Sequence, residues 1–216
     1  MARVRRLKQS RTYEVALSRA GLGPVAGIDE AGRGACCGPI TIAACILPDR
    51  TIAGLATLTD SKKLTPAARA RLEPVIKKHA VAWSVVHIGA ADIDKRGIQW
   101  ANVTGMRRAA ALLEPGPRYI LTDALPVPGM AVPCLPMIGG DAAARCIAGA
   151  SVLAKVARDR LMDDLDARYP GYGLAAHKGY GTAVHTRAIK ELGACAQHRM
   201  SYANVAAAHA QWQRGA

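Results

Sequence analysis

Two apolar runs near the N-terminus limit most narrowly how this chain can fold. The first, 25–29, ends in the acid Asp29 and is followed by Glu30, and the second, 39–47, is rich in β-branched residues. Runs of this length and composition are typical of buried strands. The glycine-rich segment 30–38 joins them, and this arrangement predicts a β-hairpin.

Strand and helix patterns alternate along the rest of the chain. Further strands are predicted at 81–88, 118–122 and 130–138. Helices are predicted at 66–78, 91–113 with a break near Gly97, 143–168, 182–192 and 203–212. This order predicts an α/β layer fold with a mixed sheet. We expect a basic N-terminal arm or helix at 1–20 and one domain at 21–216 that includes the last helices.

Length and apolar content indicate a folded, soluble protein. The chain has 216 residues, of which 50% are hydrophobic, so it can bury a sizeable core, and an intrinsically disordered chain is excluded. No apolar run reaches the roughly 18 residues that a membrane helix needs. We therefore expect a cytoplasmic protein with no membrane partner.

The charge balance is strongly positive. Lys and Arg number 29 against 16 Asp and Glu, which gives a formal net charge of +13 at pH 7. Such an excess favours a polyanionic partner, and nucleic acid is the commonest one. The alternative is that the charge only keeps a small protein soluble.

Neither the cysteines nor the histidines have the spacing of a zinc motif. The six cysteines include no C-x-x-C pair, and the six histidines include no H-x-x-H pair. We expect the cysteines to be small buried apolar side chains in a reducing compartment. A zinc site is not expected.

Four acids are candidates for chemistry. Asp29, with Glu30 beside it, and Asp123 each end a predicted strand, where open α/β sheets place their sites. Asp141 precedes the longest predicted helix. Structural roles remain open for each: Asp29 and Glu30 could open a turn, Asp123 could form an Asx-turn, and Asp141 could cap the helix.

If the four acids converge, their mutual repulsion decides what they bind. Two like charges about 4 Å apart repel by roughly 4 kcal/mol at an effective dielectric near 20. A cluster of this kind must take up protons or cations, and oxygen ligands favour Mg²⁺ or Mn²⁺ over zinc. An acidic metal site in a basic protein is the combination expected of a two-metal phosphodiesterase.

At these acids the chain resembles the ribonuclease HII family. The matching blocks run in family order from about residue 24 to 202: Gly27-Ile-Asp-Glu-Ala-Gly-Arg-Gly34, Asp60-Ser-Lys-Lys-Leu64, Ile120-Leu-Thr-Asp123, Gly140-Asp141, 150–159, Tyr172-Gly173 and His177-Lys-Gly-Tyr-Gly-Thr182. The resemblance implies a ribonuclease H-like mixed β-sheet flanked by helices, with a small C-terminal helical portion. It also implies a monomer.

The resemblance implies a specific reaction. Asp29, Glu30, Asp123 and Asp141 would bind Mg²⁺ or Mn²⁺ and form the catalytic set. The enzyme would hydrolyse the RNA strand of RNA/DNA hybrids by two-metal catalysis. It would also cut on the 5′ side of single ribonucleotides embedded in duplex DNA, leaving 5′-phosphate and 3′-hydroxyl ends.

The resemblance also implies a set of substrate-binding residues. Gly32, Arg33 and Gly34 would sense the 2′-hydroxyl, which distinguishes RNA from DNA, and Tyr180 would stack on the next deoxyribose. Three lysines are expected to contact the substrate backbone: Lys62, Lys63 and Lys178. The chain departs from the usual family pattern at Ala124, Gly139 and Cys146, which brings metal affinity and loop mobility into question.

Three alternatives stay open at this point. A sister ribonuclease HIII is disfavoured because only about 24 residues precede the first predicted strand, too few for the extra N-terminal domain usual in that family. Another ribonuclease H-like nuclease or resolvase would cut DNA regardless of ribose. A non-catalytic nucleic-acid-binding protein would bind hybrids without hydrolysing them.

Overall fold

A five-stranded sheet is the centre of the fold in a computed structural model, which describes residues 7–215. The strands lie in the order β3-β2-β1-β4-β5. Their bounds are β1 (Val25–Ala31), β2 (Ile40–Ile46), β3 (Ala82–Ile88), β4 (Tyr119–Asp123) and β5 (Cys134–Met137). β1, β4 and β5 run parallel, and β2 lies beside β1, as the predicted hairpin requires. The predicted α/β fold with a mixed sheet is confirmed.

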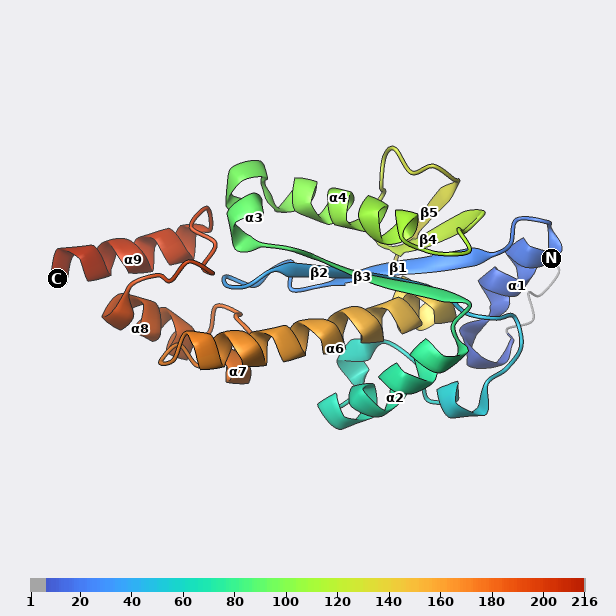
Figure 1. Cartoon of the computed structure of the whole chain (residues 1–216), viewed down its shortest axis with the longest axis horizontal. Coiled ribbons are helices and arrows are strands. Elements are labelled where there is room, and N and C mark those ends of the chain that lie inside the picture. The colour runs from blue at the N-terminus through green and yellow to red at the C-terminus, as the bar shows by residue number, and fades with distance from the viewer. Residues whose placement is uncertain (1–6, 216) are drawn as a thin grey trace. The chain divides into compact units, whose positions relative to one another are not determined.

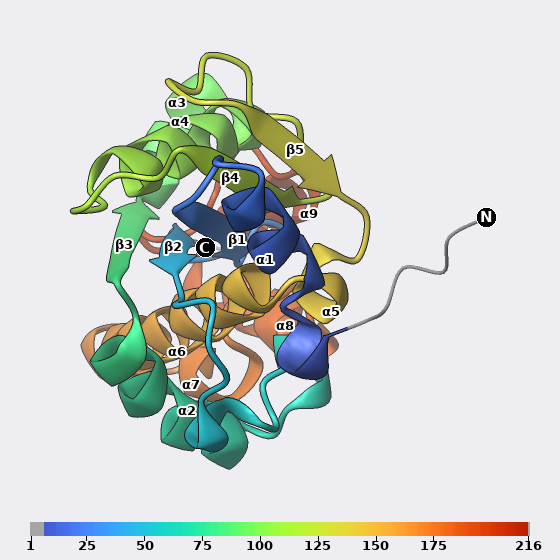
Figure 2. The same cartoon turned by 90° about the vertical axis from the view of Figure 1, so that its right-hand side faces the viewer.

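Helices cover both faces of this sheet (Figures 1 and 2). α4 (Ile98–Ala111) lies on one face, where Ser84 of β3 donates a 2.6 Å hydrogen bond to the carbonyl of Ala109. α6 (Arg145–Arg168) lies on the other face, and Gly27 of β1 permits its close approach. A Cβ on Gly27 would lie 2.2 Å from the backbone of Cys146. Glycine at this strand position therefore sets the spacing between sheet and helix.

The remaining helices are short or amphipathic. They are α1 (Thr12–Arg19), α2 (Pro66–His79), α3 (Ala90–Arg96), α5 (Gly140–Ala143), α7 (Leu174–His177), α8 (Ala183–Leu192) and α9 (Ala203–Gly215), with 3-10 turns η1 (Lys8–Ser10), η2 (Ala53–Leu55) and η3 (Ser61–Lys63). Thr65 caps α2 by accepting a hydrogen bond from Ala68, and Pro66 occupies its first turn. None of the described helices is long and apolar enough to cross a membrane.

Most predicted elements lie within a few residues of those observed. The predicted break in the helix at 91–113 is real: Gly97 separates α3 from α4 at a φ of +86°, a conformation that favours glycine. β5 is shorter than the predicted strand at 130–138 and comprises only Cys134–Met137. Asp141 lies in the separate helix α5 and not directly before the long helix. The part of the predicted basic arm before residue 7 lies outside the described residues.

The chain divides into two compact units. The sheet unit comprises Met1–Glu30, Ile42–Val86 and Val103–Val156, and the C-terminal unit comprises Ala31–Thr41, His87–Asn102 and Ala157–Ala216. In the sheet unit, residues such as Val25, Leu121 and Ile147 form an apolar cluster between strands and α6. In the C-terminal unit, Met162, Leu165, Leu174 and Ile189 pack together.

Candidate active site

Two of the predicted acids lie near the carboxyl ends of neighbouring parallel strands: Asp29 is two residues before the end of β1, and Asp123 is the last residue of β4. Ile28 of β1 pairs with Thr122 of β4, so the next residue on each strand is an aspartate, Asp29 and Asp123. Asp29 is 6% exposed and Asp123 is half-buried. Parallel pairing therefore brings two carboxylates to one edge of the sheet, as the sequence pattern predicted.

The third acid reaches the same place from α5. Carboxylate oxygens of Asp29, Asp123 and Asp141 all lie within 4.8 Å of one another, and Asp141 is only 6% exposed. The N–H of Gly140 donates a 2.8 Å hydrogen bond to Oδ1 of Asp123. A Cβ on Gly140 would lie 2.6 Å from Cδ1 of Ile147 and 3.4 Å from Oδ1 of Asp123, so the absence of a side chain leaves room for this approach. This long-range bond also replaces the local Asx-turn considered for the Asp123 side chain.

Burial and repulsion make the cluster electrostatically costly. Desolvation, followed by the charge of Glu30, raises the pKa of Asp29 well above its usual range, although hydrogen bonds from Ser151 and the Glu30 N–H oppose the rise. Desolvation also raises the pKa of Asp141, and its hydrogen bond with Asp60 and the charge of Asp123 add to the effect. These carboxylate oxygens fit a divalent cation, because the cation would relieve their mutual repulsion and compensate for their desolvation.

Glu30, the fourth predicted acid, lies beside the cluster. Among the described residues, the group of oxygens within 4.8 Å comprises Asp29, Asp123 and Asp141 alone. Glu30 is half-buried beside Asp29, and its N–H donates a 2.7 Å hydrogen bond to Oδ1 of Asp29. Its charge therefore acts on the cluster from the adjoining position.

Asp60 is an acidic neighbour of the cluster that the sequence analysis did not single out. Its carboxylate accepts a 2.8 Å hydrogen bond from the N–H of Lys62, capping η3, and its side chain also bonds Asp141. Ser61 beside it bonds Ser151 at 2.7 Å, and Ser151 bonds Asp29. Asp60 belongs to a block that matched the family, and this was the signal that could have identified it.

Lys62 lies near the acids of the cluster. Burial alone would lower its pKa, but the charges of Asp141, Asp29, Asp60 and Asp123 raise it instead. The ammonium therefore partly balances the cluster. Lys63 is exposed on the same 3-10 turn.

The predicted ribose-sensing segment lies in the C-terminal unit and is fixed by two buried arginines. Arg199 donates hydrogen bonds to the carbonyls of Gly32 and Arg33, at 2.8 and 2.9 Å. Gly32 has a φ of +86°, and a Cβ there would lie 1.9 Å from Nε of Arg158. Gly34 faces open space. The segment is therefore held rigidly at Gly32 and left accessible at Gly34.

Tyr180 lies next to this segment. The N–H of Cys36 donates a 2.8 Å hydrogen bond to the carbonyl of Gly179, which ties the two loops together. The Tyr180 ring is 41% exposed, and the guanidinium of Arg158 lies 5.7 Å from its centroid. One face of the ring is thus supported by a cation, and the side chain remains accessible to a sugar or base.

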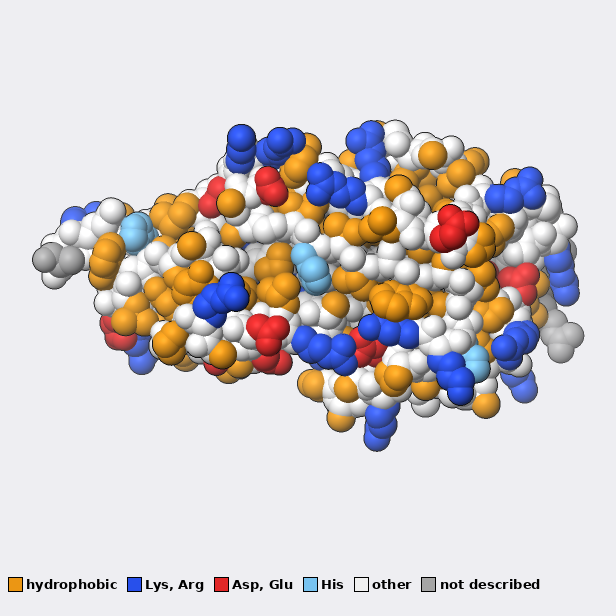
Figure 3. Space-filling model, viewed as in Figure 1, with side chains coloured by type: hydrophobic (Ala, Val, Ile, Leu, Met, Phe, Trp, Pro, Cys, Tyr) orange, Lys and Arg blue, Asp and Glu red, His pale blue; other side chains and the backbone are white. Residues whose placement is uncertain are grey.

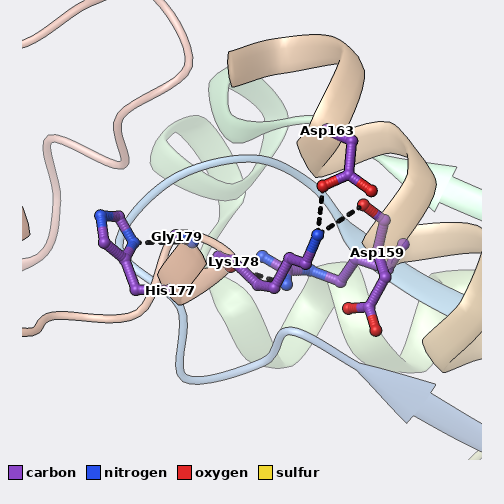
Figure 4. Close-up of polar contacts among 6 residues, drawn as sticks. Asp159, Asp163, His177, Lys178 and Gly179 are labelled. Carbon is purple, nitrogen blue, oxygen red and sulfur yellow. Dashed lines mark hydrogen bonds and ion pairs between the residues drawn. The ribbon is translucent and has the colours of Figure 1, made fainter. Parts of the chain in front are cut away.

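Lys178 is already engaged within its own unit. Its ammonium forms an ion pair with Asp163 and donates a 3.3 Å hydrogen bond to the carbonyl of Asp159, as Figure 4 shows. The carbonyl of Lys178 accepts a 2.9 Å hydrogen bond from Arg158. A phosphate contact by Lys178 would have to compete with Asp163, a pair of the kind that contributes about 0–1 kcal/mol.

The three departures from the family pattern have distinct structural settings. Ala124 has a φ of +52°, a region that favours glycine, so the residue directly after Asp123 is strained. Gly139 has a φ of +65° and precedes α5. Cys146 is fully buried, and its N–H donates a 2.8 Å hydrogen bond to the carboxylate of Glu14 from α1.

Comparison with known proteins points to one family. The sequence profile of the family described as Ribonuclease HII matches residues 26–205. The chain is 69% identical to a ribonuclease HII of Corynebacterium efficiens over 98% of this chain and 92% of that protein. It is 63% identical to that of Corynebacterium diphtheriae over 97% of this chain and 92% of that protein.

A solved structure agrees in fold. The crystal structure of ribonuclease H2 from Pyrococcus horikoshii OT3 superposes with a TM-score of 0.75 at 24% identity, covering 88% of this chain and 99% of that one. Members of the matched family are metal-dependent endoribonucleases that act on RNA/DNA substrates. This chain belongs to the ribonuclease HII family.

Proposed function

We propose that this enzyme hydrolyses the RNA strand of RNA/DNA hybrids and cuts on the 5′ side of a single ribonucleotide embedded in duplex DNA. The products would carry 5′-phosphate and 3′-hydroxyl ends. The observation that carries the proposal is the convergence of Asp29, Asp123 and Asp141 within 4.8 Å at the edge of the sheet. The net charge of +13 supplies the attraction for a polyanionic duplex.

The acids would hold the catalytic metal. Asp29, Asp123 and Asp141, with Glu30 beside them, present the hard oxygen donors that Mg²⁺ and Mn²⁺ prefer. Two such ions supply activation of a water for in-line attack and stabilisation of the leaving 3′-oxygen. Gly140 holds the carboxylate of Asp123 in place through its backbone N–H. The side chain of Ser151 holds the carboxylate of Asp29 in place through a hydrogen bond.

Recognition of the ribose would belong to the C-terminal unit. Gly32, Arg33 and Gly34 would contact the 2′-hydroxyl, because glycine lets backbone groups approach the sugar closely. The exposed ring of Tyr180 would stack on the following deoxyribose.

Three lysines would contact phosphates of the substrate: Lys62, Lys63 and Lys178. The basic surface in Figure 3, where Lys and Arg side chains are spread widely with fewer acids between them, supports a phosphate-binding role.

Cleavage of a labelled DNA duplex with one embedded ribonucleotide tests the proposal. The expected result is a single cut on the 5′ side of that ribonucleotide with Mg²⁺ or Mn²⁺, and none with EDTA or on an all-DNA duplex. Asp123→Asn should abolish cleavage while its circular dichroism matches wild type. Asp164→Asn, at an exposed position on α6, is the matched control and should retain full activity.

The same experiment separates the alternatives. Cleavage of the all-DNA or branched duplex at comparable rates would indicate a nuclease that ignores the ribose and overturn the proposal. Tight binding without cleavage, unchanged by EDTA, would indicate a binding protein. We further propose that the enzyme acts as a monomer in the cytoplasm, where its bacterial relatives keep their DNA; sedimentation at micromolar concentration tests the first point.

A further inference from the structure

Two cysteines and a histidine that are distant in sequence meet in the C-terminal unit. Ligand atoms of Cys37, Cys195 and His198 all lie within 4.8 Å of one another. Cys37 and His198 are buried, while Cys195 is half-buried. Backbone contacts fix the arrangement, since Cys37 and His198 form an antiparallel bridge. Cys195 and His198 are three residues apart in the sequence, but only the tertiary fold brings Cys37 to them.

A relay of hydrogen bonds fixes which nitrogen of His198 faces the sulfurs. The carbonyl of Tyr180 can only accept, so Nδ1 of His185, 3.0 Å away, carries a proton. Nε2 of His185 must then accept from Nε2 of His198, 3.0 Å away. This leaves Nδ1 of His198 unprotonated, and it lies 3.1 Å from Sγ of Cys195. An outer partner that fixes the tautomer in this way is a regular feature of metal-binding histidines.

Two buried guanidiniums lie near the sulfurs. The carbonyl of Cys37 accepts a 3.2 Å hydrogen bond from the buried guanidinium of Arg158, and Arg199 is buried nearby. The positive charges of both guanidiniums favour the thiolate form in which cysteine binds a metal.

We propose that Cys37, Cys195 and His198 form a second metal site, specific for a thiophilic ion such as Zn²⁺. Two thiolates and one imidazole nitrogen are the donor set that zinc takes in three-ligand sites, with a water in the fourth position. Binding forms two Zn–S bonds and one Zn–N bond, and each thiol that binds the ion as a thiolate releases its proton to solvent. The ion also displaces the 2.9 Å hydrogen bond from the Cys195 N–H to Nδ1 of His198.

The site would link two segments that matter for substrate recognition. Cys37 is the next-to-last residue of the glycine-rich segment that contains Gly32 and Gly34, and the segment at 195–199 supplies Arg199, which holds Gly32. The N–H of Gly38 already donates a 2.8 Å hydrogen bond to the carbonyl of Gln197. A zinc ion would reinforce this junction and stabilise the C-terminal unit, because an ion that binds only the folded state raises its stability.

Zinc binding by the whole reduced protein tests the proposal. All variants carry Asp123→Asn, so that the acidic cluster itself binds less zinc. The protein is stripped with a chelator, loaded with Zn²⁺, desalted in excess Mg²⁺ and analysed by elemental mass spectrometry. We expect about one zinc per chain. Cobalt loading should give a sulfur-to-cobalt charge-transfer band in the near ultraviolet, which oxygen ligands do not produce.

Variants separate this site from adventitious binding. Cys195→Ser, at the more exposed position, and Cys37→Ala should both lose the zinc and the cobalt band, whereas Cys134→Ser in β5 should retain them. Circular dichroism confirms that each variant is folded. Zinc retained equally by Cys195→Ser, no zinc in the reduced background protein, or a Cys37–Cys195 disulfide that forms in place of metal binding would each overturn the proposal.

Discussion

The guanidinium of Arg199 donates a 2.8 Å hydrogen bond to the carbonyl of Gly32, so a residue near the end of the chain fixes a segment that follows the first strand. A second buried arginine, Arg158, lies against the same glycine, where a Cβ would meet its Nε at 1.9 Å. Buried guanidiniums need several acceptors, and here backbone carbonyls of the glycine-rich segment provide them. The conformation of that segment therefore depends on both arginines.

Gly32→Ala should destabilise the protein strongly, whereas Gly34→Ala should not. Alanine at a φ of +86° is strained by about 1–3 kcal/mol, and displacement of Arg158 adds to this cost. A Cβ on Gly34 meets nothing within 4 Å, so we expect a change within about 0.5 kcal/mol. Urea denaturation of both variants measures the difference. Equal stabilities would show that the contact with Arg158 does not constrain Gly32.

Divalent metal should stabilise the folded enzyme through the acidic cluster. An ion that binds only the native state adds about 2.7 kcal/mol at 100 times its Kd. Asp141→Asn should lose this response and, without metal, should be at least as stable as wild type, because one buried charge is removed from a repulsive group. Thermal melts with Mn²⁺ and with EDTA measure both effects. Asp164→Asn, on the exposed face of α6, should respond to Mn²⁺ as wild type does.

An unchanged melting temperature of wild type across millimolar Mn²⁺ would contradict this prediction. A response that persists fully in Asp141→Asn would instead place the stabilising ion elsewhere.

The sequence was informative about this cluster because local rules apply to it. Asp29 and Asp123 lie near or at the carboxyl ends of strands that pair in parallel, and parallel strands bring these ends to one edge of the sheet. The break at Gly97 was equally predictable from a local preference. Asp60 was missed because its role depends on a hydrogen bond to Asp141, which is remote in sequence. Cys37 and His198 were missed for the same reason: no spacing rule connects residues that only the tertiary fold brings together.

Acid should weaken the C-terminal unit through His185. Burial, the largest effect, lowers the pKa of this histidine to about 4, with the neighbouring His177 and His198 contributing. The unfolded chain takes up a proton near pH 6.5 and the folded chain only near pH 4, so stability is lost as pH falls through this window. The loss is at most about 3 kcal/mol. The free energy of unfolding measured between pH 7 and pH 4 tests this.

His185→Gln provides the comparison, because it keeps polar groups without titrating in this range. The buried acids Asp29 and Asp141 have raised pKa values and act in the opposite direction, but they do so equally in both proteins. The difference in slope between wild type and His185→Gln therefore isolates the imidazole. Identical slopes would contradict the lowered pKa of His185.

Two lysines should differ in how they contribute to hybrid binding. Lys63 is exposed, so Lys63→Ala should reduce the slope of log K against log salt concentration by about one unit if it contacts a phosphate.

Lys178 must first leave its ion pair with Asp163 (Figure 4). Asp163→Asn frees the ammonium and should tighten binding at low salt, measured by fluorescence anisotropy with a catalytically inactive Asp123→Asn background. Asp164→Asn removes the same charge from the adjacent position, so an equal gain there would mean that net charge, and not release of Lys178, causes the effect.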